Sequence, residues 1–315
     1  MVLSGAGIAA GPARFLSAYL AQVHGVRARY LPPSAFAESG QRPEAHTLVL
    51  FSQSISANAQ MVLQQRAHYK HVTLVTATRP ELKGTPSERL VASLLAEGLE
   101  IIFHEPKRED GMLVRVLGPS AAALQGVRWA SGFGGQVELN HALAGLSTAV
   151  RAALDRATLL RESLSPERLL GDVAFVTCGG YGDACRGLAW KWMEGLWTKE
   201  PPLWDVLQAV HGPLQTFWER DTTLIALVDD SPISASLLKR LAGVLHPERH
   251  HLVTLKATMP GLLGMFEHGA ALDQMMVWAL GARPRDLGDW PAKGMDEPLY
   301  GLSAPLSLGE TDSTS

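Results

Sequence analysis

Cysteine is scarce in this chain. Its 315 residues include only two, Cys178 and Cys185, which are too few for a disulfide framework. Their separation does not match the short interval between the ligands of a zinc knuckle, so we expect two thiols buried in a core. We predict neither a metal site nor a cofactor.

Charged residues are also few. They make up 19% of the chain, the formal net charge is −3, and Lys and Arg form no long cluster, which argues against a nucleic-acid-binding surface. Charged residues, glycine or proline interrupt every apolar run before it is long enough to span a bilayer. The amino terminus has no basic region of the kind that begins a secretory signal. We therefore expect a cytoplasmic protein that binds neither nucleic acid nor membrane.

Hydrophobic residues, by contrast, make up 46% of the chain, enough for the core of one large or two medium domains. Apolar segments at residues 1–4, 47–51, 72–75, 99–103 and 112–116 are typical of buried strands. Helical patterns separate the first three segments, and strands that alternate with helices pair in parallel through right-handed crossovers. The first half is therefore predicted to form a doubly wound parallel sheet.

The second half of the chain repeats this pattern. Residues 173–176, 223–228 and 251–255 are again predicted strands, and the glycine corner Gly179-Gly180 matches the glycines at residues 5–7. The simplest account of the repeat is two doubly wound units joined by a helix.

A first polar motif, Ser52-Gln53-Ser54, follows the predicted strand at residues 47–51. It lies at the carboxyl end of that strand and opens a helix. Hydroxyl and amide side chains beside free backbone N–H groups suit an anion or a sugar hydroxyl. An ordinary serine N-cap is an equally good explanation of the motif.

A second motif follows the predicted strand at residues 173–176. The chain turns at Gly179-Gly180 and enters a helix in which Lys191 and Glu194 are three residues apart and share a face. His211 follows on a Gly-Pro corner. A lysine, a carboxylate and a histidine around one pocket can transfer protons. The alternative is a solvated ion pair and a loop histidine, and the spacing alone favours that alternative.

Taken in order, these motifs resemble the SIS (sugar isomerase) family, specifically proteins with two SIS domains in tandem, such as the isomerase half of glucosamine-fructose-6-phosphate aminotransferase. The resemblance covers residues 1–295. Its marks are Ser52-Gln53-Ser54, Ala189-Trp190-Lys191-Trp192-Met193-Glu194, His211-Gly212-Pro213 and Pro284-Arg285-Asp286-Leu287.

This resemblance implies an α/β fold of two doubly wound, flavodoxin-like parallel-sheet SIS domains in tandem. We place the first domain at residues 1–138, a linking helical segment at 139–168 and the second domain at 169–282. Residues 283–315 would then form a carboxyl-terminal tail that contributes to the active site.

The family also implies a chemistry, the aldose–ketose isomerisation of a sugar or sugar phosphate through an enediol or enolamine. Glu194 would be the base that moves the proton. His211 would help to open the sugar ring from the neighbouring subunit of a homodimer, and Lys191 and Lys293 would stabilise charge on the oxygens. The candidate substrate-binding residues are Ser52, Gln53, Ser54, Gly7, Gly179 and Arg186.

Several positions depart from the family pattern. Where the family has hydroxyl residues, this chain has Ile8, Ala9 and Ala57, and a family glycine is replaced by Ile55. Each lost hydrogen bond to a charged phosphate removes about 1.5–3 kcal/mol of binding. The sequence therefore leaves open whether the substrate is phosphorylated.

Two other functions remain open. The same carboxylate and imidazole could serve a deglycase or deaminase that removes an amine from a ketoamine sugar. A non-catalytic sensor of sugar phosphates is the alternative from a different class. The presence of Glu194 and His211 and the lack of a DNA-binding helix-turn-helix segment argue against a sensor.

Overall fold

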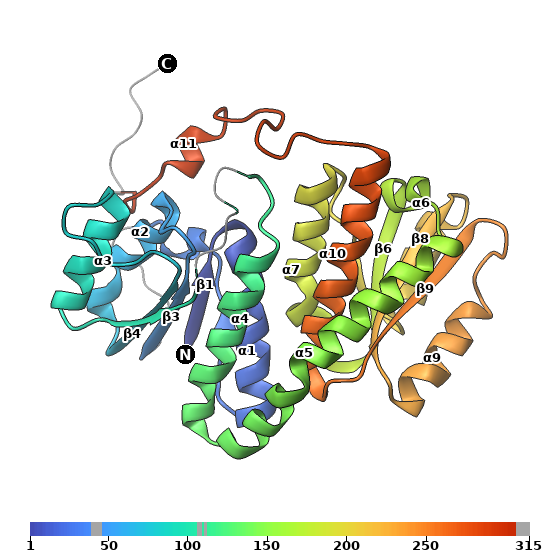
Figure 1. The fold of residues 1–315 in the computed structure, drawn as a ribbon, viewed down its shortest axis with the longest axis horizontal. Helices are drawn as coiled ribbons and strands as arrows, with labels where there is room; N and C mark the ends of the chain where they lie inside the picture. Colours follow the sequence, from blue (N-terminus) through green and yellow to red (C-terminus); the bar gives the residue numbers. More distant parts are fainter. Residues whose placement is uncertain (39–45, 106–108, 110–111, 307–315) are drawn as a thin grey trace. The chain divides into compact units, whose positions relative to one another are not determined.

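The computed structural model describes residues 1–38, 46–105, 109 and 112–306, and its internal contacts divide the chain into two units. The first comprises Met1–Phe133 together with Gly288–Ser315, and the second comprises Gly134–Leu287. Each unit has a parallel sheet with helices packed against it (Figure 1). The α/β class with parallel sheets is thus confirmed.

The first unit contains a five-stranded sheet in the order β2-β1-β3-β4-β5. Its strands are β1 (Val2–Gly5), β2 (Arg29–Tyr30), β3 (Thr47–Phe51), β4 (His71–Thr76) and β5 (Glu100–Phe103). Its helices are α1 (Ala10–His24), α2 (Ala57–Gln64), α3 (Pro86–Ala96), α4 (Leu117–Ala130) and α11 (Glu297–Tyr300), with 3-10 turns η1 (Gly7–Ala9), η2 (Pro33–Phe36), η3 (Arg66–His68) and η4 (Ser131–Phe133).

The second unit contains a four-stranded sheet in the order β7-β6-β8-β9. Its strands are β6 (Asp172–Thr177), β7 (Leu203–Asp205), β8 (Thr222–Asp229) and β9 (His250–Ala257). Its helices are α5 (Gln136–Leu159), α6 (Pro166–Leu170), α7 (Gly182–Leu196), α8 (Pro213–Phe217), α9 (Pro232–Ala242) and α10 (Met265–Ala282), with 3-10 turns η5 (Leu160–Glu162), η6 (Gly179–Tyr181), η7 (Gln208–Val210) and η8 (Gly261–Gly264).

The two sheets repeat one topology. In each unit the first strand lies between the second and third strands of that unit, and all pairings are parallel. Shortly after the first strand comes a glycine in the left-handed region, Gly7 at φ +54° and Gly179 at φ +64°. Each of these glycines begins a 3-10 turn that leads into a helix. Glycine is suited to this corner because it has no Cβ to clash there.

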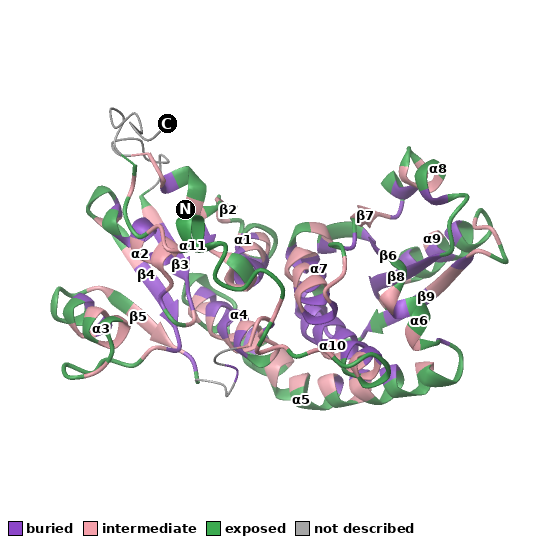
Figure 2. Cartoon of the chain, turned by 90° about the horizontal axis from the view of Figure 1, so that it is seen from above, coloured by how far each residue is buried: buried purple, intermediate pink, exposed green. Residues whose placement is uncertain are grey.

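Apolar side chains explain why these segments fold as they do. The strands β3 and β8 are buried almost throughout their lengths, as expected for a parallel sheet covered on both faces. In the second unit, buried residues are concentrated along α10 and the adjoining side of α7 (Figure 2). Trp192 of α7 meets Phe175 of β6 edge to face, with ring centroids 5.8 Å apart.

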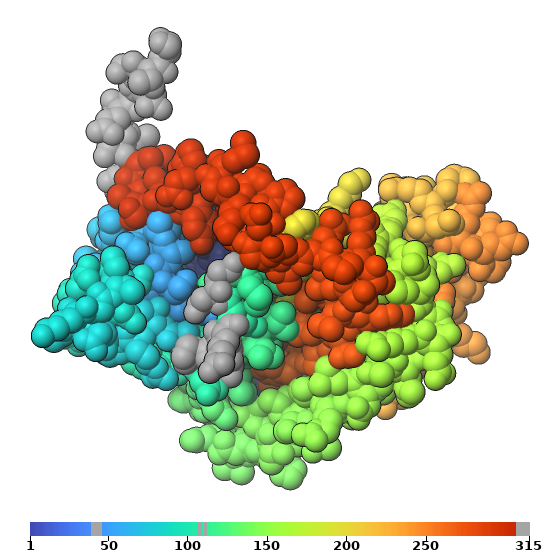
Figure 3. All heavy atoms as spheres, turned by 45° about the horizontal axis from the view of Figure 1, so that its top comes forward, coloured from blue at the N-terminus to red at the C-terminus, as the bar shows by residue number. Residues whose placement is uncertain are grey.

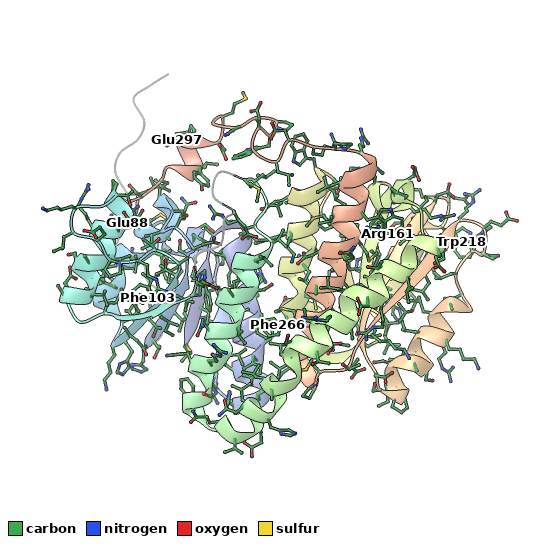
Figure 4. All side chains as sticks on the ribbon, in the orientation of Figure 1. Glu88, Phe103, Arg161, Trp218, Phe266 and Glu297 are labelled. Atoms are coloured by element: carbon green, nitrogen blue, oxygen red, sulfur yellow. The ribbon has the colours of Figure 1, made fainter. Side chains whose placement is uncertain are left out.

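Residues close together in the sequence determine where two of the helices, α3 and α6, begin. At α3, the Thr85 hydroxyl accepts a hydrogen bond from the Glu88 N–H, and the Glu88 carboxylate accepts one from the Thr85 N–H at 2.7 Å (Figure 4). This reciprocal capping box satisfies N–H groups that have no partner within the helix. Pro166 occupies the first position of α6, where its missing N–H would have had no partner within the helix.

The tail from Gly288 packs on the first unit, where its red residues lie over blue ones in Figure 3. The Asn58 amide donates to the carbonyls of Leu299 and Leu302, each at 3.0 Å. The Leu306 N–H donates to the Ala37 carbonyl at 2.6 Å. Helix α11, which begins at the Glu297 labelled in Figure 4, is held against α2 by these contacts.

One predicted strand is wrong. Residues 112–116 form an irregular segment that leads into α4. The Glu109 carboxylate accepts hydrogen bonds from the N–H groups of Val116, Leu117 and Gly118, which holds these residues at a helix start. A short apolar run does not distinguish a strand from such a helix entry.

Two further observations concern the organisation of the chain. Helix α5, which the sequence analysis placed in a linking segment, belongs to the second unit. Over the described part of the chain, no helix combines the length and the apolar character needed to cross a bilayer.

Candidate functional site

Helix α7 positions the predicted acid–base pair. It begins after the glycine corner and ends at Trp197, whose φ of +51° turns the chain out of the helix. Trp192 faces the sheet, while Gly195 lies so close to Met276 of α10 that any side chain there would collide with the methionine sulfur. With these contacts fixed, Lys191 and Glu194 lie within one turn of each other beside α10.

Glu194 is largely buried, and its carboxyl group is not fully hydrogen-bonded. Its Oε2 atom is inaccessible to solvent and has no hydrogen-bond partner among the described residues. Burial raises the pKa of this carboxyl to about 7, because the charged form loses hydration that no donor replaces. A carboxyl that titrates near neutral pH is suited to both taking and returning a proton.

Two other buried glutamates differ from Glu194. Glu109, 5% exposed, accepts three backbone N–H bonds in the first unit. Glu267, 1% exposed, accepts bonds from the N–H groups of Thr258 and Met259 and pairs with Arg156 at 3.1 Å. These two carboxylates stabilise loops, and their oxygens accept hydrogen bonds. One oxygen of Glu194, by contrast, has no donor among the described residues.

Lys191 is 3% exposed, and its ammonium pairs with Asp273 of α10 at 2.5 Å. The sequence analysis did not identify Asp273. The only signal in the sequence was an acid within a mostly apolar stretch, where an acid is rarely found without a partner. The ion pair keeps a charged lysine one helical turn from Glu194, because a buried ammonium needs a compensating charge.

The remaining candidates in the second unit lie at the surface. His211 is exposed at the end of η7, followed by Gly212 at φ +114°. Within the described residues, no hydrogen bond joins His211 to Glu194. Arg186 of α7 pairs with Glu200 at 3.4 Å, and both side chains are more than a third exposed. Gly179 is exposed at the start of η6.

In the first unit, Ser52-Gln53-Ser54 follows β3 as predicted, but its groups are largely used internally. The Ser52 hydroxyl accepts from the Ser56 N–H at 3.3 Å, and Ser56, not Ser52 or Ser54, is the N-cap of α2. The Gln53 side chain packs against Gly118, where a Cβ would collide with it. Ser54 is exposed.

Apolar residues close the space beside this motif. A cavity of 20 Å³ lies there, with Ile8, Ala9 and Pro12 in its wall together with Ser52 and Gln53. A volume of this size accommodates about one water molecule and is too small for a phosphate. Gly7 lies at the exposed corner beside it.

Lys293 belongs to the first unit. Its ammonium donates to the Gly288 carbonyl at 2.5 Å and lies 4.7 Å from the Trp290 ring centroid. Ser52, Gln53, Ser54, Gly7 and Lys293 are thus in one unit, and Glu194, Lys191, His211, Gly179 and Arg186 are in the other. Among the described residues, no group of three or more histidine, cysteine or acidic side chains could hold a metal ion.

Solved structures provide the comparison with known proteins. A proposed phosphosugar isomerase from Clostridium difficile 630 superposes with a TM-score of 0.70 at 13% identity, covering 95% of this chain and 88% of that one. The C-terminal domain of glucosamine-fructose-6-phosphate aminotransferase from Francisella tularensis gives 0.66 at 12% identity, over 92% and 86%. Glucosamine-6-phosphate deaminase from Thermotoga maritima gives 0.62 at 14% identity, over 97% and 90%.

These likenesses extend over nearly the whole chain, so this protein has the fold of those structures. No family model matches the sequence, and no curated protein matches it.

Proposed function

We propose that this protein is a sugar isomerase built from two SIS domains in tandem, with Glu194 as the base of an aldose–ketose isomerisation. The observation that carries the proposal is the buried Glu194 carboxyl, with one oxygen lacking a partner among the described residues and a pKa near 7. Stability gains nothing from such a group, so a role in proton transfer accounts for it.

In this proposal, the Glu194 carboxylate takes the proton from C2 of the aldose and returns it to C1, through an enediol. Lys191, held by Asp273, supplies positive charge for the oxygen that becomes negative. His211 opens the sugar ring, and its exposed position suits a role across the interface of a homodimer. Lys293 from the tail is proposed as a second cation.

The proposed substrate is a sugar or a sugar phosphate, with Ser52, Gln53, Ser54, Gly7, Gly179 and Arg186 as proposed contacts. The 20 Å³ cavity beside Ser52 favours a substrate without a phosphate at that position, or a motif that opens on binding. A deglycase or deaminase of ketoamine sugars would use the same carboxylate.

Product analysis with fructose 6-phosphate, glucosamine 6-phosphate, a fructosamine phosphate and free fructose separates these reactions. We expect Glu194→Gln to lower kcat by about 10²–10⁴-fold while the protein stays folded. The kcat/KM of the unmodified enzyme should rise with pH through about 7, as the base ionises.

Glu138→Gln is the matched control, because Glu138 is exposed on α5 of the same unit. This variant should keep full activity. Full turnover in Glu194→Gln would remove the catalytic role. No turnover in either form, with unchanged ligand affinity, would identify a sensor instead.

A further inference from the structure

The largest cavity described in the second unit lies away from the glycine corner. It measures 620 Å³ and opens at the amino ends of β6 and β8, where Asp172 and Thr222 begin those strands. Trp197 and Thr198, which follow the end of α7, form part of its wall. Its volume falls within the roughly 300–1,000 Å³ of small-molecule sites. It lies at the opposite end of β6 from Gly179, which follows the carboxyl end of that strand.

The wall of this cavity carries excess positive charge. Its charged side chains are Lys199, Arg220, Arg283, Arg285, Asp172 and Glu200. Both acids are already paired, Asp172 with Arg220 at 3.3 Å and Glu200 with a residue outside the wall. Within the described residues, no carboxylate pairs with Lys199, Arg283 or Arg285. Helix dipoles favour cations at the ends of α7 and α10, but they do not explain an open cavity between them.

Aromatic side chains supply flat apolar surface in the same wall. Trp197 is the left-handed residue that ends α7, at φ +51°. Its ring lies 5.1 Å from the Arg285 guanidinium. Trp204 stacks on Phe217 with centroids 5.7 Å apart. Indole rings bind the flat face of a sugar or a base.

We propose that this cavity is a second ligand site, which binds a phosphate ester that carries a ring. Lys199, Arg283 and Arg285 hold the phosphate, because guanidinium and ammonium groups form charge-assisted bonds to it. Trp197 and Trp204 contact the ring. A sugar phosphate and a nucleotide share this chemistry, and the two sources are separated by the probes below.

The test is calorimetric titration of the full chain with inorganic phosphate, glucose 6-phosphate and ADP, at low and at physiological salt. At least one ring-bearing ester should bind about tenfold more tightly than inorganic phosphate, and added salt should weaken it. The double variant Lys199→Gln, Arg283→Gln should lower the affinity about tenfold. Both residues are exposed, so the fold should tolerate their replacement, and circular dichroism checks this.

Two controls locate the binding. Arg151→Gln removes an exposed arginine of α5 outside the cavity and should leave the affinity unchanged. Ser54→Ala, at an exposed proposed substrate contact of the first unit, should also leave it unchanged, which separates this site from the proposed catalytic one. Inorganic phosphate that binds as tightly as both esters would overturn the proposal, as would ester binding that persists in the double variant or is lost in Ser54→Ala.

Discussion

The two units differ most where the third strand of each repeat gives way to a helix. In the first unit, five residues separate β3 from α2, and Ile55 among them has φ +52°. In the second, two residues separate β8 from α9, and the Asp229 carboxylate accepts hydrogen bonds from Ser231 and Ser234. The same topology thus has a long loop after β3 in the first unit. The corresponding loop after β8 in the second unit is short and is closed by its own hydrogen bonds.

The pKa of Asp229 fits its role as the acceptor of these hydrogen bonds. Burial acts to raise its pKa, but the hydrogen bonds from Ser234 and Ser231 outweigh burial and hold the pKa below its usual value. The first unit has no carboxylate at the matching place, and the backbone N–H of Ser56 meets the Ser52 hydroxyl instead. The short loop is thus held by hydrogen bonds to its own carboxylate, whereas the long loop contains a residue with a left-handed backbone.

The largest expected effect is a loss of stability, and it tests whether the folding of each unit depends on its own hydrogen-bonded buried glutamate. Glu267→Ala removes the acceptor of the Thr258 and Met259 N–H groups and the ion-pair partner of Arg156, which should destabilise the second unit by about 3 kcal/mol. Urea unfolding followed by hydrogen exchange measures this loss unit by unit. Glu109→Ala should instead weaken the first unit by about 2 kcal/mol. A loss below about 1 kcal/mol for either variant would contradict the structural role.

Replacing Glu194 should have the opposite effect and stabilise the protein above neutral pH. Its folded pKa of about 7 lies above the reference value of 4.5, so between these pH values the unfolded chain releases a proton that the folded protein keeps. Stability therefore falls as pH rises from 4.5 to about 7. Glu194→Gln should remove this loss and be more stable than the unmodified protein at pH 8, by about 2 kcal/mol.

Thermal unfolding from acid to mildly alkaline pH measures that difference. The control Glu138→Gln should follow the unmodified protein at every pH. A Glu194→Gln variant that is less stable than the unmodified protein at high pH would show that Glu194 is a structural residue, like Glu109 and Glu267.

The backbone of the long loop gives a smaller effect. Ile55 is fully buried but has a left-handed backbone, which strains any residue that has a Cβ. Ile55→Ala and Ile55→Gly both lose the buried side chain, but only glycine relieves the strain. We expect the glycine variant to be the more stable of the two by about 1 kcal/mol, the reverse of the usual order. Denaturant midpoints compare them, and an alanine variant of equal stability would show that no strain is present.

The smallest effect concerns the tail that covers α2. Asn58→Ala removes two hydrogen bonds to tail carbonyls and should cost about 1 kcal/mol, with faster proteolysis after Gly288. Gln60→Ala on the same helix loses a bond to Ile55 instead and should leave the tail protected. Equal cleavage of the two variants would show that Asn58 does not hold the tail.

Much of the fold was predictable because burial leaves a periodic pattern. The strands at β3, β4, β6, β8 and β9 were each placed to within a residue or two, since each has a run of mostly apolar residues at its centre. The edge strands β2 and β7 were missed, because two or three half-exposed residues carry no such pattern. The segment at 112–116 was misassigned because its apolar residues enter a helix.

The candidate site was less predictable. Lys191 and Glu194 share one helix, so their spacing was visible in the sequence. Asp273, which pairs with Lys191, comes from α10 far along the chain, and no local pattern connects the two. The family motif identified Ser52-Gln53-Ser54, but only packing showed that Ser56 is the cap and that apolar side chains nearly fill the space beside it.

The sequence by itself determined the alternation of strands and helices, the repeat and the left-handed glycine corners, because these depend on residues close together in the chain. The tertiary structure decided which buried carboxylates find donors. Glu109 and Glu267 meet backbone N–H groups, whereas Glu194 keeps an oxygen without a partner among the described residues. That outcome depends on which distant segments meet in the folded chain, and a one-dimensional pattern does not specify it.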